Sequence, residues 1–496
     1  MPDNTESRQA NAQPLQDAGR KPSPMPPAKQ FTFGSYALDK NNSTLTFEYE
    51  VELEDGSSRS FKDVLTVTGA SAQMWDSVPK DVLEPLCESL SLILGVNYWK
   101  IHCAPSLRIK DFEIDKTQAD FWNAVYEKGL AEFFYLSKRD FRGLISFPYS
   151  EKPKEPGKKT PFPRRRRALL AQGGGKDSAV SAEMLREQGM PFDLFVVGYT
   201  SMQELSMRVI GRPFIYVKLQ RHPIIYQTRY SRQVPVGYPL LMMYMFTSVL
   251  LAALFDYRYI VFSNESSADI PHTTYLGLDV NHQWSKSKEA EYLTRAYIIS
   301  NISQDIIPFS LLRQFSEIEM VRRFVAYPQY FFAFSSCNLN FFTSRSKATA
   351  REGRAYWCNS CPKCIFIFAC LSAFIPKKTL LDMFGENLYA KPELLPWFKQ
   401  LLGLEGFKPL ECVGSAEEMI VAMHRASLEG EYNDTVAMEL FSAHFSHLDT
   451  ETLDSMEKNV FGAHGESLVP PEFMRKGMLS RSITFLRNRL TPRSVA

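Results

Sequence analysis

The pattern of hydrophobic and polar positions first predicts a small β-rich unit near the start of the chain. Between residues 31 and 67 apolar and polar residues alternate, and the turn-forming residues 54–57 interrupt the alternation. A period of two is typical of strands that turn one face to water. Helical patterns follow at 82–94 and 119–136. We therefore predict a β-hairpin followed by helices, which together form an α+β domain over residues 31–147.

After residue 167 the pattern changes to strands that alternate with helices. A strand at 168–171, a glycine-rich loop, a helix at 178–188 and a strand at 192–197 follow one another directly. This order predicts a βαβ unit with parallel strands, which further strands at 214–219 and 259–262 extend. The apolar run 239–255 is shorter than the ~20 residues that cross a bilayer, so it predicts a buried helix. We expect an α/β catalytic domain over residues 167–375.

The segments between and around these units have a different composition. Residues 1–30 are rich in Pro, Ala, Gln and Asp without a signal-peptide core, and they predict a disordered tail. Residues 148–166 are rich in Pro, Lys and Arg and predict a linker. Its basic residues either contact RNA or a diphosphate, or are simply solvated, which we favour. Residues 376–496 predict a helical C-terminal region.

Composition and charge exclude several classes of protein for this chain. The chain of 496 residues has 57 Lys and Arg against 55 Asp and Glu, so it lacks the global positive field that gathers nucleic acid or anionic lipid. A hydrophobic share of 45% excludes a disordered chain. The eight cysteines, four of them between residues 337 and 364, do not resemble a secreted disulfide framework. We expect a protein of the reducing cytoplasm that has no membrane span and no nucleic-acid partner; the oligomeric state stays open.

The glycine-rich loop is the clearest candidate for a ligand site. Three glycines between a strand and a helix let backbone amides approach an anion, and the helix N-terminus adds a favourable dipole. In this loop Lys176 can neutralise a phosphate, Ser178 can donate its hydroxyl and Asp177 can hold Mg²⁺. The loop consists of Gly173, Gly174, Gly175, Lys176, Asp177 and Ser178.

The spacing in this loop separates it from two common phosphate loops. A Walker A loop needs a glycine where Leu170 stands and a Ser or Thr where Asp177 stands. The dinucleotide fingerprint needs a glycine where Ser178 stands. The hexapeptide instead resembles the pyrophosphatase loop of adenylating enzymes, with Gly173 in place of the usual Ser. That resemblance implies an enzyme that cuts ATP between its α- and β-phosphates.

Two further polar segments are candidate site residues. Asn264 and Glu265 follow the predicted strand 259–262, where the carboxyl end of a parallel strand offers groups to ligands or metal. The same residues can instead form a helix cap and turn. His282 and Lys286 lie in a dense polar run over 280–287, which can bind a carboxylate or phosphate and move a proton.

Four cysteines form the third cluster. Cys337, Cys358, Cys361 and Cys364 offer the four thiolates that tetrahedral Zn²⁺ binds, although the spacing differs from paired zinc knuckles. Two of these thiols can alternatively exchange the proton of a carbon acid, or all four can be small buried residues. Zinc is the interpretation we favour.

Taken together, these motifs resemble the ATP-dependent UDP-N-acetyl-α-D-muramoyl-L-alanyl-L-glutamate epimerase family of peptidoglycan synthesis. The resemblance spans residues 31–374 and rests on residues 94–100, 128–135, 173–178, 234–236, 263–265, 280–287 and 357–364. It implies a fold of the ATP-pyrophosphatase type, and ATP with Mg²⁺ bound by residues 173–178, Asn264 and Glu265. The substrate would be the UDP-muramoyl dipeptide, whose terminal L-Glu becomes D-Glu through an acyl-adenylate, with release of AMP and diphosphate.

Within this reaction we expect proton transfer from the polar run and the cysteines. The catalytic candidates are His282, Lys286, Cys358 and Cys361. Two other functions stay open at this stage. One is a pyrophosphatase-loop enzyme that modifies a nucleobase or tRNA and holds a structural zinc, and the other is a non-catalytic ATP-sensing scaffold.

Overall fold

The computed structural model describes residues 25–151, 160–198, 200–230, 234–235, 237–337 and 357–474. Residues 1–24 of the expected tail, 152–159 of the expected linker and 475–496 of the expected C-terminal region lie outside these described residues.

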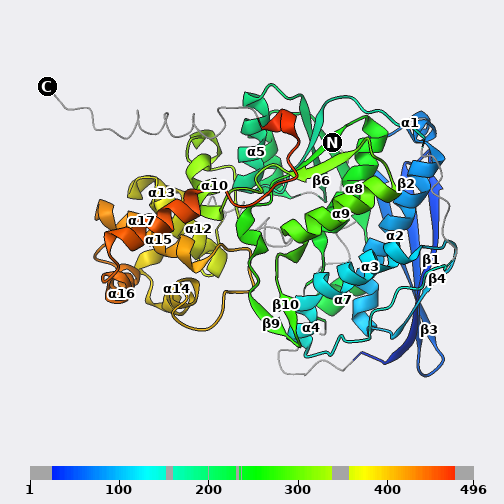
Figure 1. Cartoon of the computed structure of the whole chain (residues 1–496), viewed down its shortest axis with the longest axis horizontal. Helices are drawn as coiled ribbons and strands as arrows, with labels where there is room; N and C mark the ends of the chain where they lie inside the picture. Colours follow the sequence, from blue (N-terminus) through cyan, green and yellow to red (C-terminus); the bar gives the residue numbers. More distant parts are fainter. Residues whose placement is uncertain are drawn as a thin grey trace.

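One nine-stranded mixed sheet forms the centre of the protein, in the order β11-β8-β5-β6-β7-β3-β2-β1-β4 (Figure 1). The strands are β1 (Ala28–Asp39), β2 (Thr44–Leu53), β3 (Ser58–Val67), β4 (Ser106–Ile109), β5 (Ala168–Ala171), β6 (Phe192–Val197), β7 (Phe214–Gln220), β8 (Tyr259–Phe262) and β11 (Ile307–Ser310). A separate two-stranded hairpin consists of β9 (Thr273–Tyr275) and β10 (Leu278–Val280).

The part of the sheet from β7 to β11 is doubly wound. All neighbours in this part are parallel, and the chain runs from β5 outward to β6 and β7 before it returns to β8 on the other side of β5. The strand order therefore reverses between β5 and β8. In open α/β sheets ligands bind beyond the carboxyl ends of the strands at such a switch point.

The N-terminal strands continue this sheet. β3 pairs antiparallel with β7, and β2, β1 and β4 follow it toward the far edge. The α+β unit and the α/β unit expected from the sequence thus share one sheet, while the residue boundaries given above for separate domains stay a prediction. The expected alternation is confirmed in β2, where every second side chain is buried.

The helices flank both faces of the sheet and extend beyond one end of it. They are α1 (Ala72–Ser77), α2 (Lys80–His102), α3 (Lys116–Gly129), α4 (Ala131–Ser137), α5 (Lys176–Glu187), α6 (Ser201–Ile210), α7 (Ile224–Tyr230), α8 (Leu240–Phe255), α9 (Lys288–Asn301), α10 (Glu317–Phe324), α12 (Pro362–Ser372), α13 (Lys377–Phe384), α14 (Leu395–Leu401), α15 (Ala416–Glu429), α16 (Val436–Phe445) and α17 (Thr450–Phe461). Short 3₁₀ turns η2 (Ser266–Asp269) and η3 (Trp284–Lys286) follow β8 and β10.

Successive residues of the central strands belong to two different cores, because side chains alternate across a strand. One core contains Leu169, Phe195 and Ile260 with the buried sides of α2 and α8. The other contains Leu170, Leu194 and Val261 with α5, α10 and α12. Both faces of the central strands are therefore covered, and only their ends remain for a ligand.

Most expected elements of the α/β unit are confirmed. The strands expected at 168–171, 192–197 and 259–262 coincide with β5, β6 and β8, and α5 begins two residues before the expected helix. The expected helix at 119–136 is divided into α3 and α4 at Leu130. The apolar run 239–255 forms the buried helix α8. Within the described residues, no helix has both the length and the apolar character that a membrane span requires.

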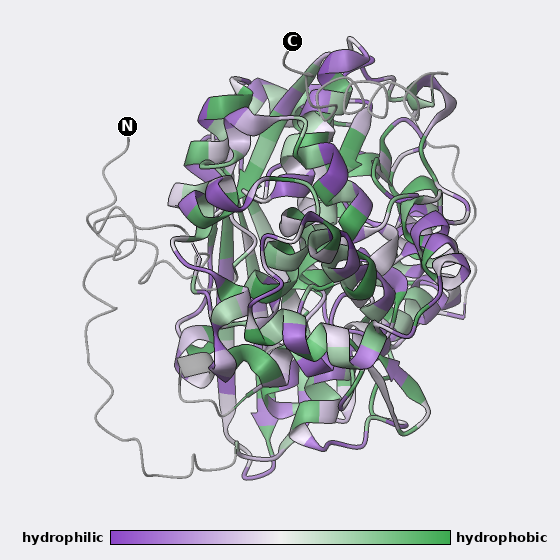
Figure 2. Cartoon of the chain, turned by 90° about the vertical axis from the view of Figure 1, so that its left-hand side faces the viewer, coloured by the Kyte–Doolittle hydropathy of each residue, from purple (hydrophilic) through white to green (hydrophobic). Residues whose placement is uncertain are grey.

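Helices α12 to α17 gather at the end of the molecule opposite β1 to β4 (Figure 1). They confirm the expected helical character of the described part of the C-terminal region. Figure 2 faces this end of the molecule, and hydrophilic residues interleave with hydrophobic residues along its helices. This interleaving agrees with helices that bury one side and expose the other.

Candidate active site at the carboxyl ends of β5 and β8

The glycine-rich loop connects β5 to α5 at the switch point of the sheet. Gly174 has a φ of +81°, and a Cβ at this position would lie 3.1 Å from the backbone nitrogen of Gln203. Gly173, by contrast, has no neighbouring atom within 4 Å of a Cβ. The loop therefore requires glycine at position 174 and has space for a side chain at position 173.

A side chain that the sequence did not single out shapes the loop. The Gln172 side-chain oxygen accepts a hydrogen bond from the Gly174 N–H at 3.0 Å and another from the Ser178 hydroxyl. Gln172 also donates to Ser206 at 3.0 Å. The Ser178 hydroxyl, expected to donate to a phosphate, is thus already engaged within the loop.

Three carboxylates meet next to this loop. One oxygen each of Asp177, Glu265 and Glu317 lies within 4.8 Å of the others. Buried Lys176 donates to Glu317 at 2.9 Å and also contacts Asp177. The structure thus brings together the two carboxylates proposed from the sequence and adds Glu317. Glu317 begins α10 after the N-cap Ser316, and a glutamate in a first helical turn is too common to have marked it as a site residue.

The charges of this group depend on one another. Burial would lower the pKa of the Lys176 ammonium, but Asp177 and Glu317 raise it above its usual value. Burial, together with the negative charges of Glu317 and Asp177, raises the pKa of Glu265 to about 7. Such a cluster of acids can hold a divalent cation, because a cation relieves the repulsion among them.

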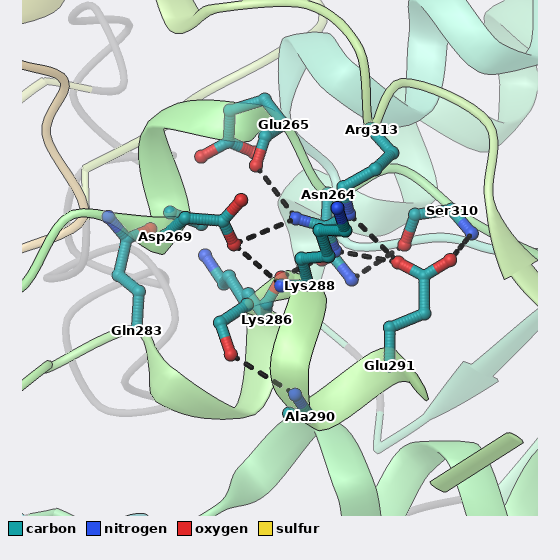
Figure 3. Close-up of polar contacts among 12 residues, drawn as sticks. Asn264, Glu265, Asp269, Gln283, Lys286, Lys288, Ala290, Glu291, Ser310 and Arg313 are labelled. Carbon is teal, nitrogen blue, oxygen red and sulfur yellow. Dashed lines mark hydrogen bonds and ion pairs between the residues drawn. The ribbon is translucent and has the colours of Figure 1, made fainter. Parts of the chain in front are cut away.

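Arg313 connects the two segments that carry Glu265 and Lys286 (Figure 3). Its guanidinium is 1% exposed and donates to the Glu265 carbonyl at 3.0 Å and to the Lys286 carbonyl at 2.6 Å. It also donates to the Glu291 carboxylate at 2.7 and 2.9 Å. One buried cation therefore sets the relative position of the two polar segments expected from the sequence. The Asn264 side chain donates to Ser310 at 2.9 Å and thereby ties β8 to β11.

His282 and Lys286 face a thiol from a distant part of the chain. Lys286 donates to the sulfur of Cys412 at 3.2 Å, and His282 also forms a hydrogen bond with Cys412. The His282 Nδ1 lies 2.8 Å from a Glu132 carboxylate oxygen. Neither Cys412 nor Glu132 belonged to the expected site. Glu132 lies in the segment 128–135, which supported the family resemblance without a site role, and Cys412 has no spacing to other residues that marks it.

The four expected cysteines form a separate cluster. The sulfurs of Cys337, Cys358, Cys361 and Cys364 all lie within 4.8 Å of one another. The Cys358–Cys364 and Cys361–Cys364 separations are 3.6 and 3.5 Å. Thiolates at 2.3 Å from one Zn²⁺ are ~3.8 Å apart, so the cluster fits that ion with little adjustment. Cys358 and Cys361, which we expected as catalytic residues, both belong to this thiol cluster.

The basic run 164–167 has partners within the chain. Arg164 and Arg165 form ion pairs with Asp256 at 3.5 and 3.0 Å, and Arg167 pairs with Asp193 at 3.6 Å. The Arg167 guanidinium also stacks on Tyr257 at 4.0 Å. Arg165 and Arg166 are nevertheless exposed, as the favoured solvated run requires, whereas Arg164 and Arg167 are partly buried against the fold.

Fold and site together define a doubly wound α/β protein with an acidic, lysine-containing site at its switch point. Comparison with known proteins identifies the family. A family model described as the MurL N-terminal domain matches residues 24–311. A second model, described as the MurL C-terminal domain, matches residues 333–456. The chain belongs to the MurL family, as its motifs indicated.

Three similar proteins are each named UDP-N-acetyl-alpha-D-muramoyl-L-alanyl-L-glutamate epimerase. The protein from Salinispora tropica is 32% identical over 89% of this chain and 94% of its own length. Those from a Micromonospora species and from Xanthomonas oryzae pv. oryzae are both 30% identical, over 90% and 89% of this chain and 97% and 95% of their own lengths. No solved structure matches this chain.

Proposed function

We propose that this protein is an ATP-dependent epimerase, which converts the terminal L-Glu of UDP-N-acetylmuramoyl-L-Ala-L-Glu to D-Glu. The observation that carries the proposal is the meeting of Asp177, Glu265 and Glu317 with Lys176 at the switch point of a MurL-family chain. The relatives named for this epimerisation align with this chain over nearly their whole length. The glycine-rich loop and the doubly wound sheet support a fold of the ATP-pyrophosphatase type.

The consumption of ATP has a chemical reason. The α-proton of a glutamate is very weakly acidic, because its removal places a second negative charge beside the carboxylate. Adenylation of that carboxylate removes the first charge and offers a carbonyl that takes up the electron pair as an enolate. Hydrolysis of the epimerised acyl-adenylate then gives D-Glu and AMP, and diphosphate leaves in the adenylation step.

The charges around the three carboxylates favour a polyanion such as ATP. Burial would raise the pKa of Glu317, but the ammonium groups of Lys176 and Lys363 lower it below its usual value. Lys286 contributes a further positive charge to the same group. Ammonium groups beside carboxylates can bind phosphate oxygens while the carboxylates hold the metal.

The acidic group also fits Mg²⁺. Two oxygens at about 2.1 Å from one Mg²⁺ are at most ~4.2 Å apart. The three carboxylates already lie within 4.8 Å, so displacements of well below an ångström allow Asp177, Glu265 and Glu317 to bind one ion. Bound there, Mg²⁺ would neutralise charge on the phosphates that leave as diphosphate.

We further propose that Cys337, Cys358, Cys361 and Cys364 hold a structural Zn²⁺. The ion would hold the start of α12 against the segment that contains Cys337, and Lys363 lies between two of its ligands. Metal analysis of the purified protein should find about one zinc per chain, and Cys361→Ser should lose it. Zinc-free protein with full stability would contradict this assignment.

The decisive test of the function uses one reaction. Purified protein with ATP, Mg²⁺ and UDP-N-acetylmuramoyl-L-Ala-L-Glu should form AMP, diphosphate and D-Glu, and omission of ATP should abolish the inversion. Asp177→Asn is the matched variant, since it keeps the shape of the side chain and removes one metal-binding charge. ADP instead of AMP would refute the adenylation step, and unchanged L-Glu with full ATP cleavage would refute the epimerisation.

A further inference from the structure

The contact between Cys412 and the polar run at 282–286 is the strongest feature outside the acidic group. Cys412 lies between α14 and α15, more than 120 positions from Lys286 along the chain, yet the two side chains meet at 3.2 Å. Cys412 is partly buried as a residue. Its neighbours are two cationic side chains, which is an unusual environment for a structural cysteine.

The neighbours of the thiol favour its ionised form. Burial would raise the pKa of Cys412, but Lys286, Lys363 and the hydrogen bond from His282 lower it well below its usual value. Burial would likewise lower the pKa of His282, but hydrogen bonds to Cys412 and Glu132 raise it to about 10. These pKa shifts favour a thiolate beside an ammonium and an imidazolium, and the 3.2 Å contact with Lys286 agrees with that pairing.

The Lys286 side chain connects Cys412 with the acidic group. Lys286 donates to the Cys412 sulfur. Arg313 donates to the Lys286 carbonyl at 2.6 Å and to the Glu265 carbonyl at 3.0 Å. The charges of Glu265 and Asp177 also act on the Lys286 ammonium. A substrate whose carboxylate is adenylated at the acidic group would thus have its α-carbon in the neighbourhood of Cys412.

We propose that Cys412 is the base that exchanges the α-proton of glutamate on one face of the substrate. The proposal rests on the epimerase function proposed above. The thiolate takes the proton, the Cα–H electron pair moves into the adenylated carboxyl group as an enolate, and Cys412 becomes a thiol. The opposite face of the α-carbon then receives a proton that derives from water through a second side chain, and the thiol returns its proton to solvent.

The other groups have different roles in this arrangement. His282 stays protonated up to a pH of about 10, so it is a poor base and instead holds the thiolate, with Glu132 as its own partner. Lys286 neutralises the thiolate and orients it toward the acidic group. The three carboxylates are the metal-binding groups of the proposed function and are not available as bases. Cys412 is therefore the group best suited to remove a proton.

The first experiment separates proton exchange from adenylation. Cys412→Ser and Cys412→Ala are compared with the wild-type chain and with Cys87→Ala, which removes a buried thiol from α2. Dipeptide-dependent exchange of diphosphate into ATP reports adenylation, and deuterium entry at the glutamate α-carbon in D₂O reports proton exchange. We expect both Cys412 variants to keep the diphosphate exchange within a few-fold and to lose deuterium entry by roughly 100-fold or more.

The outcomes decide between the two proposals. Deuterium entry within a few-fold of wild type in Cys412→Ser would overturn the role of Cys412 and leave the epimerase intact. Absence of inversion in the wild-type chain would overturn the proposed function itself.

A second experiment needs no substrate. Alkylation of wild-type protein by iodoacetamide, followed at the Cys412 peptide by mass spectrometry, should reach its plateau rate well below the pH at which an ordinary thiol does. Lys286→Met should move that profile upward in pH, although the neighbouring charges of His282, Lys363, Lys408 and Glu411 remain. A wild-type profile that rises only around pH 8.5, as for an ordinary thiol, would contradict the thiolate.

Discussion

Replacement of Arg313 by methionine tests how the site is held together. Methionine fills much of the same volume but cannot donate a hydrogen bond. The substitution leaves the Glu291 carboxylate, which is 3% exposed, without its cation. It also removes the donors to the Glu265 and Lys286 carbonyls. Both the stability of the fold and the geometry of the site should therefore change.

The size of the effect follows from these contacts. Removal of one partner from a buried ion pair costs about 3–5 kcal/mol of unfolding free energy. The Lys286 carbonyl left without a donor costs about 1–3 kcal/mol more, whereas the Glu265 carbonyl keeps the Ala268 N–H at 3.4 Å. We expect a loss of about 5 kcal/mol and a decrease of the melting temperature of about 5 °C. Arg208→Met, which breaks the exposed pair with Glu204, should cost below about 1 kcal/mol.

A double variant separates the buried charge from the positioning role. Arg313→Met combined with Glu291→Gln removes the uncompensated charge and keeps an acceptor for the Ser310 N–H, which now bonds to Glu291 at 2.9 Å. Thermal unfolding should show that the double variant recovers part of the lost stability. The epimerase assay should nevertheless stay at least roughly 100-fold below wild type, because neither carbonyl regains its donor.

Two results would refute this reasoning. A melting temperature of Arg313→Met equal to that of Arg208→Met would show that the buried pair contributes nothing to the fold. Full activity in the stabilised double variant would show that the site does not depend on Arg313 for its shape.

Three further predictions test other contacts by substitution. Glu317→Gln should raise the Mg²⁺ concentration needed for half-maximal AMP formation by about tenfold or more, and an unchanged Mg²⁺ titration would remove Glu317 from the metal site. Gly174→Ala should abolish ATP cleavage and lower stability by about 1–2 kcal/mol through its positive φ, whereas Gly173→Ala should change little; equal effects in both would contradict the loop geometry. Because the folded-state pKa of His282 is raised to about 10, the stability from its contact with Glu132 is complete below pH 6.5 and is lost as the pH rises toward 10. The difference in melting temperature between wild type and Glu132→Gln should shrink over that range, and a constant difference would exclude the imidazolium.

Sequence reasoning was most successful where the signal is local. The strands β5, β6 and β8 and the buried helix α8 were predicted nearly to the residue, because periodicity and turn residues act over short stretches of chain. The glycine-rich loop and Glu265 were placed at the ends of β5 and β8 for the same reason. Their meeting then follows from a topological rule, because parallel strands bring their carboxyl ends to one edge.

The pairing of β3 with β7 was not predicted from the sequence. Residues 64–67 and 217–220 are more than 140 positions apart, and each strand taken alone is an ordinary amphipathic segment. The alternation showed that β2 and β3 have one wet face, but it contains no information about which strand lies at their edge. The two expected domains therefore appeared separate, although one sheet runs through both.

The sequence by itself determined the class of fold, the position of the glycine-rich loop, two of the three clustered carboxylates and the four clustered thiols. Only the tertiary structure decided that Glu317 completes the acidic group, that Arg313 holds its segments, and that Cys412 faces Lys286 and His282. The physical reason is the range of the interactions. Periodicity, capping and loop spacing act between near neighbours in the chain, whereas a pKa, an ion pair or a metal site depends on which distant side chains the folded core brings within a few ångströms.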